Sequence, residues 1–155
     1  MTGIGRFLEP GQGARLDFGG IDTLFRVSAD WVDGAYCVVE QVLPARYLVR
    51  PHEHTSEDQV AIVLSGEIGF RVGDSEFVGG AGAVSVRPRR VPHANWNPTD
   101  APATMLEITS PGRFEQYWHE MAASGRPAAD VAADWGISYV DEWIDDLRSR
   151  YGLRV

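Results

Sequence analysis

The chain has 155 residues, which suits a single domain, and 44% of them are hydrophobic, which is enough to fill a core. A formal net charge of −8 and a pI near 4.9 argue against nucleic acid and anionic membrane surfaces as partners. An apolar run at residues 60–64 is far too short to span a bilayer, and residues 1–13 contain no apolar signal region. We therefore expect a cytoplasmic protein that binds neither nucleic acid nor membrane.

Short segments rich in β-branched and aromatic residues follow one another through the first 110 residues, separated by Gly, Pro, Asp and Ser. These expected strands cover residues 21–27, 35–42, 45–54, 59–64, 67–72, 75–78, 83–88 and 104–110. The pattern predicts an all-β barrel or sandwich. The single cysteine, Cys37, cannot form an internal disulfide and is expected to be a small buried residue in a strand.

After Pro111 the apolar residues recur with the period of a helix. Three helices are predicted. The first and third carry apolar stripes at residues 114–122 and 140–151, and the second is a short helix at residues 128–135. A glycine directly follows the second helix and another directly follows the third. Such aromatic stripes are more often packing surfaces than a cofactor site. We therefore expect residues 1–112 to form the barrel and residues 113–155 to form a helical extension packed on the barrel or on a partner subunit.

Three of the four histidines occur at positions that suit a metal site. His52 and His54 are two residues apart, so on a strand both side chains leave the same face. Gln59 and His93 follow them, whereas His119 lies off the helical stripe and is expected to be a solvated helix residue. Imidazole nitrogen suits several transition metals, and four protein ligands leave one or two positions open for substrate.

Two segments resemble the two signatures of the cupin family. The first runs from His52 to Gly66 (His-x-His, four residues, Gln, six residues, Gly), and the second from Gly82 to Asn97 (Gly, five residues, Pro, four residues, His, three residues, Asn). The resemblance covers roughly residues 20–112 and implies an antiparallel double-stranded β-helix, a metal site and a homodimer. Three residues depart from the family pattern: Arg46 and Arg90 replace motif glycines at turns, and Gln59 replaces the commoner Glu.

The resemblance implies that His52, His54, Gln59 and His93 bind one divalent transition metal, which could be Fe, Mn, Ni, Zn or Cu. Because all four ligands are neutral, they leave the full charge of the ion uncompensated and make it a stronger Lewis acid. An amide cannot accept a proton as a carboxylate does, so any general base must be another residue.

Two charged residues are candidate catalytic groups. Arg50 precedes His52 by two, so on a regular strand it faces the ligands and could bind a substrate carboxylate, whereas a bulge near Val49 or Pro51 would turn it to solvent. Glu107 would be a general acid or base if it points into the barrel, and an ordinary exposed strand residue if it does not. The run at residues 106–114 resembles the closing strand of small cupins that act on pectin-derived uronates, in which an acid at this position assists catalysis.

Other polar residues near the signatures receive less weight. Asn95 and Asn97 share the face of His93 and either line the pocket or cap a turn. Glu57 and Asp58 lie in a loop where carboxylates are usually solvated, so at best they contact and support the ligands. The apolar pocket walls are predicted to be Ala61, Val63, Phe70 and Met105.

Three functions from different classes are compatible with these residues. The first is a metal-dependent isomerase or lyase that acts on a small oxygen-rich or enolisable molecule, with Glu107 moving the proton. The second is a dioxygenase similar to quercetinases, which cleave flavonols and related enols. The third is a module that binds a sugar or a small acid without turning it over.

Overall fold

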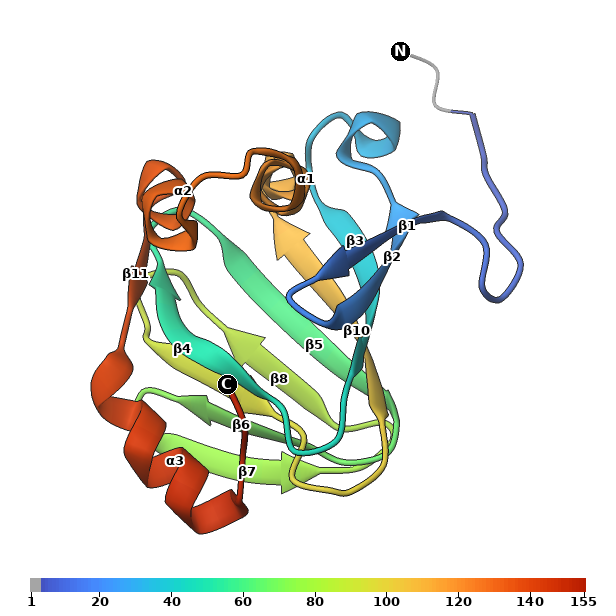
Figure 1. The fold of residues 1–155 in the computed structure, drawn as a ribbon. Coiled ribbons are helices and arrows are strands. Elements are labelled where there is room, and N and C mark those ends of the chain that lie inside the picture. Colours follow the sequence, from blue (N-terminus) through green and yellow to red (C-terminus); the bar gives the residue numbers. More distant parts are fainter. Residues whose placement is uncertain (1–3) are drawn as a thin grey trace.

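The computed structural model describes residues 4–155, which form two antiparallel β-sheets packed face to face (Figure 1). The six-stranded sheet has the order β1 (Ala14–Phe18), β2 (Ile21–Val27), β3 (Cys37–Leu43), β10 (Ala103–Ser110), β5 (Asp58–Ser65) and β8 (Val84–Arg87). The five-stranded sheet has the order β11 (Ile137–Tyr139), β4 (Leu48–His54), β9 (His93–Trp96), β6 (Ile68–Val72) and β7 (Ser75–Gly79). The predicted all-β antiparallel fold is confirmed.

Alternation along the strands decides which residues fill the space between the sheets. In β3 and β10 every second residue is buried, as expected when one face of a strand meets the interior. Towards one end of the sandwich these inward residues are apolar and form a cluster of Ile21, Leu43, Ala61, Val63, Ile68, Phe70, Ala103 and Met105. Towards the other end they are polar and form the site described below.

The two arginines that replace signature glycines lie in left-handed turns. Arg46 has a φ of 57° and Arg90 a φ of 62°, a region that costs most L-residues about 1 kcal/mol or more. Arg46 offsets this cost through a two-point contact between its guanidinium and the carboxylate of Asp100, at 2.8 and 2.9 Å. The backbone N–H of Arg90 donates to the carbonyl of His54 at 2.7 Å, so this turn braces the strand that carries two of the site histidines.

The helical extension packs on the sandwich at two places. Helices α1 (Glu115–Ala123) and α2 (Ala128–Asp134) lie across one end of it, above the strands (Figure 1). Phe114, Tyr117 and Trp118 of the first predicted stripe are buried there with Phe25 and Cys37. The short 3₁₀ helices are η1 (Ala29–Val32), η2 (Gly112–Phe114) and η3 (Asp141–Trp143).

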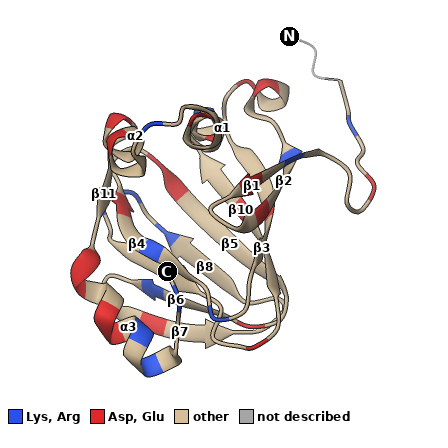
Figure 2. Ribbon diagram, in the orientation of Figure 1, with Lys and Arg blue, Asp and Glu red and all other residues tan. Residues whose placement is uncertain are grey.

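Helix α3 (Ile144–Tyr151) covers the outer face of the five-stranded sheet, where Leu147 packs on Leu48 and Trp96. The acidic residues of α3 lie in its first turn and the basic residues in its last turn (Figure 2), and Arg150 binds Glu76 on β7 at 2.6 Å. Within residues 4–155, no helix combines the length and apolar character that a membrane span requires.

One strand of the extension was not predicted. Residues Ile137–Tyr139 form β11, which pairs antiparallel with the three residues from His52 to His54. Three residues between Gly136 and Val140 are too few to show a strand period, so the sequence pattern could not indicate this element. The extension therefore supports the His-x-His strand directly through backbone pairing.

The outer face of the six-stranded sheet is apolar over β5, β8 and β10. Val84 and Val86 on β8 are 53% and 61% exposed, and Val60 and Ile62 lie opposite them on β5. Leu106 and Ile108 of β10 continue this face, which the helices of Figure 1 leave uncovered.

Candidate metal centre

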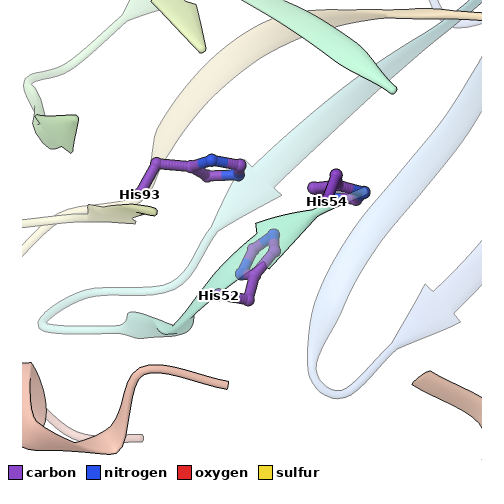
Figure 3. Close-up of side chains that lie close together, drawn as sticks. All are labelled: His52, His54 and His93. Carbon is purple, nitrogen blue, oxygen red and sulfur yellow. The ribbon is translucent and has the colours of Figure 1, made fainter. Parts of the chain in front are cut away.

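Three histidines from two neighbouring strands come together between the sheets. His52 and His54 project from β4 and His93 from β9, and the rings turn toward one another (Figure 3). One ring nitrogen of each lies within 4.8 Å of those of the other two. The backbone pairing of His52 with His93 across β4 and β9 produces this approach.

Hydrogen bonds leave one nitrogen of each ring free. The Nδ1 atoms of His52 and His93 lie 2.7 and 3.1 Å from the carbonyls of Arg50 and Val91, and Nδ1 of His54 lies 3.2 Å from a carboxylate oxygen of Glu57. Because each partner is an acceptor, Nδ1 must carry the proton, and the lone pair of each ring is on Nε2. The Nε2 atoms of His54 and His93 are buried with no hydrogen-bond partner among the described residues.

Burial keeps the rings of His52 and His93 neutral. Burial, together with the neighbouring His54 and the charge of Arg87, lowers the pKa of His52 to about 3. Burial also holds the pKa of His93 well below its ordinary value, with contributions from His52 and Arg87. A neutral imidazole is the form that binds a metal, so the rings of His52 and His93 can act as ligands near pH 7.

Gln59 lies on β5 in the facing sheet, with its side chain buried. Its Nε2 donates to Glu107 Oε1 at 2.6 Å and to Thr109 Oγ1 at 3.3 Å. These bonds fix the orientation of the amide, because an amide oxygen would repel the carboxylate. The amide oxygen is left buried without a hydrogen-bond partner in the described chain, which suits the predicted role of Gln59 as an oxygen ligand. That role itself stays a prediction.

Glu107 points into the sandwich, so the alternative of an exposed strand residue was wrong. Its side chain accepts a hydrogen bond from Gln59 and forms a buried ion pair with Arg87, from Nη2 to Oε2 at 3.1 Å. Arg87 is 1% exposed and was missed from the sequence. Alternation in β8 allows either the two valines or Ser85 and Arg87 to face inward, and the structure buries Ser85 and Arg87.

Arg50 lies at the edge of the site. The pairing of β4 with β9 shifts register between Val49 and His52, which is the irregularity that the sequence left open. The guanidinium of Arg50 binds Asp141 at 2.6 and 2.8 Å and stacks over the ring of Tyr139 at 3.7 Å. Arg50 still lines the cavity, so neither of the two expected orientations describes it fully.

Among the remaining polar residues, Glu57 was wrongly expected in solvent. It is 1% exposed and bonded to His54, whereas Asp58 is half-exposed and binds Arg89 at 2.6 Å. Asn95 lines the cavity and Asn97 caps a turn through the carbonyls of residues 43 and 101, so each takes one of the two roles considered. His119 is exposed and stacks on Phe25, with ring centres 4.7 Å apart.

A cavity of about 380 Å³ opens beside the histidines. Its polar floor includes Gln41, Asn95, Glu107 and Arg87, and its walls include Phe18, Ile21, Val49, Tyr117, Met121 and Tyr139. The predicted walls were wrong, because Ala61, Val63, Phe70 and Met105 belong to the closed apolar cluster. Sequence alternation identified them as inward residues but not their position along the strand.

The family model described as the cupin domain matches residues 38–109. The structure is similar to that of KdgF from Halomonas sp., with a TM-score of 0.64 and 18% identity over 73% of this chain and 99% of that one. It is also similar to an RmlC-like cupin from Shewanella frigidimarina (TM-score 0.59, 20% identity, 75% of this chain and 99% of the other). A predicted oxalate decarboxylase from Thermotoga maritima gives a TM-score of 0.56 and 19% identity over 63% of this chain and 90% of that one. No curated protein matches the sequence.

The structure therefore has the cupin fold, a double-stranded β-helix built from two antiparallel sheets, and carries C-terminal helices. His52, His54 and His93 form a cluster that can bind a metal ion. Neutral nitrogens with lone pairs turned inward fit a divalent transition metal by their donor chemistry. At these identities the solved structures establish the shared fold.

Proposed function

We propose that this protein is a metal-dependent enzyme of the isomerase or lyase type, acting on a small oxygen-rich or enolisable molecule. The supporting observation is that three neutral imidazoles present free Nε2 atoms to one another while their Nδ1 atoms are already bonded. His52, His54, His93 and Gln59 would hold one divalent ion. When bound, the ion would polarise a carbonyl or enol oxygen of the substrate as a Lewis acid.

The charges around the site favour a singly charged anionic substrate. Of the buried charged residues, Glu57 contacts His54, and Glu107 and Arg87 line the cavity, whereas Glu115 lies apart and is bonded to Ser28 and Ala29. With a divalent ion, the ion, Glu57, Glu107 and Arg87 together would carry one net positive charge, rather than the two expected when only the neutral ligands are counted. A monoanion would neutralise this charge in a low-dielectric interior.

Glu107 is the candidate proton carrier. Arg87 and Gln59 each hold one of its oxygens, which fixes the carboxylate at the cavity floor, and each oxygen keeps a further lone pair. Such a group can accept a proton from a bound substrate and return it elsewhere. Arg50 remains our candidate for binding a substrate carboxylate, which would take the place of Asp141.

A dioxygenase is the second candidate. The aromatic side chains of Phe18, Tyr117 and Tyr139 in the cavity wall suit a planar aromatic enol better than a sugar acid. A binding module remains the third candidate, because a fold and a ligand pocket do not by themselves imply turnover.

Elemental analysis of protein purified without added metal tests the metal site. We expect about one divalent transition-metal ion per chain in the wild type and a large loss in the His52→Ala variant. Retention of the native ratio by this variant would remove the assignment.

The reaction class is tested with the metal-loaded protein in D₂O. Candidate substrates are small uronates and aromatic enols, followed by proton NMR and by an oxygen electrode. We expect exchange or conversion of an acidic C–H without oxygen uptake, slowed at least tenfold by Glu107→Gln. Oxygen uptake would favour the dioxygenase, and inertness toward every candidate that binds would favour the binding module.

We also propose that the chain forms a homodimer. The outer face of the six-stranded sheet supports this proposal, because an uncovered apolar face spanning several strands is suited to contact with a second copy. Sedimentation equilibrium tests the homodimer, and a monomer at all concentrations would contradict it.

The cytoplasmic location also remains a prediction.

A further inference from the structure

Glu57 differs from the other acidic residues near the site. It lies in the short loop between β4 and β5, and its side chain is completely buried. Its neighbour Asp58 turns outward to the exposed Arg89. The chain thus places one of two consecutive acids in the interior and the other on the surface.

The buried carboxylate contacts a candidate metal ligand. Oε2 of Glu57 lies 3.2 Å from Nδ1 of His54, and Oε1 has no hydrogen-bond partner among residues 4–155. No arginine in the described chain forms an ion pair with it. A buried carboxylate with so few partners is costly unless a positive charge lies close to it.

The three histidines are therefore not equivalent. His52 and His93 donate from Nδ1 to neutral backbone carbonyls, whereas His54 donates to a carboxylate. A carboxylate partner fixes the tautomer and ring orientation and makes the opposite nitrogen a stronger donor to a cation. Its negative charge also attracts the ion through the ring.

We propose that Glu57 is a positioning residue that acts through His54 and sets the affinity of the site for a divalent cation by its charge. The inference rests on the proposed metal site. It assigns Glu57 the charge compensation that Gln59, as a neutral residue, cannot provide.

The test is metal affinity, measured by competition between the protein and a chelator for Zn²⁺ and for Co²⁺. Glu57→Gln keeps an acceptor for Nδ1–H but removes the charge, and we expect at least tenfold weaker binding. Glu57→Ala removes both the acceptor and the charge, and we expect its metal affinity to fall by up to about 100-fold. Asp58→Asn is the matched control, because it removes an adjacent exposed acid, and its affinity should stay within about twofold of the wild type.

Thermal unfolding of the metal-free variants separates this role from a structural one. We expect Glu57→Gln to unfold at the wild-type temperature or above it, because it removes a buried charge. The absorption bands of the Co²⁺ form should shift in Glu57→Gln and not in Asp58→Asn. Wild-type affinity in Glu57→Gln would overturn the inference while the metal site stands. Failure of the wild type to bind either ion would overturn the proposed function as well.

Discussion

The two faces of the six-stranded sheet differ most at the end that holds the site. On β8 the inward side chains are Ser85 and Arg87, while Val84 and Val86 face outward. On β10 the inward Glu107 lies between the outward Leu106 and Ile108. Alternation therefore identifies a strand, but a polar functional interior can reverse which set of residues is buried.

The inner face also changes along each strand. On β10, Met105 belongs to the apolar cluster and Glu107, two residues on, belongs to the site. One continuous face thus has an apolar part that stabilises the fold and a polar part whose buried charged groups lose hydration but form the site. Substitutions on the two parts and on the outer face should therefore give different results.

The largest effect is expected from breaking the buried ion pair on the inner face. Arg87→Met leaves the carboxylate of Glu107 buried without its charged partner and should lower the free energy of unfolding by about 3–5 kcal/mol. Urea denaturation measures this loss. The double variant Arg87→Met/Glu107→Gln removes both charges and should recover most of it. A loss below about 1 kcal/mol in the single variant would contradict the importance of the pair.

A somewhat smaller loss is expected in the apolar part. Met105 is 1% exposed, so Met105→Ala should leave a cavity and cost about 2–4 kcal/mol. Because Met105 does not line the site cavity, the affinity for Zn²⁺ should stay within about twofold of the wild type. Denaturation and metal titration of the same variant check both statements. A tenfold loss of affinity would show that the two parts are not separable.

The reactivity of the Cys37 thiol tests whether solvent and reagents reach the interior between the sheets. Burial raises the pKa of its thiol to about 12, and the charges of Glu115 and Glu107 contribute. The folded protein should therefore not react with a thiol-specific reagent at pH 8, and denaturant should expose one reactive thiol. Since the folded pKa exceeds the unfolded one, this group's contribution to stability is present below pH 9 and falls as the pH rises toward 12. Rapid labelling of the folded chain would contradict the closed interior.

The sequence predicted β2 to β8 and β10, the helices of the extension and the histidine cluster because each rests on local periodicity or spacing. The strands β1, β9 and β11 were not among the expected segments. His52 and His54 needed only strand alternation, and the turns at Arg46 and Arg90 occur where the resemblance placed them. The sequence did not predict Arg87 as a site residue, because alternation alone does not show whether Arg87 or the neighbouring valines of β8 face the interior.

The burial of Glu57 was also missed, because a loop residue shows no period and its burial depends on how β4 and β5 meet. The strand β11 was missed for a related reason, since its pairing with His52–His54 is a long-range contact. Contacts between segments distant in the chain thus account for what the sequence pattern left out.

The smallest effect is expected on the outer face. Val86 is 61% exposed, so Val86→Thr should change the free energy of unfolding by less than about 0.5 kcal/mol in dilute protein. The matched variant Val63→Thr places the same hydroxyl at a position that is 1% exposed and should cost about 1–3 kcal/mol. If the proposed homodimer uses the outer face, the cost of Val86→Thr should grow with protein concentration, because dimerisation stabilises the folded chain by mass action. Equal costs for the two variants in dilute protein would contradict the assignment of the faces.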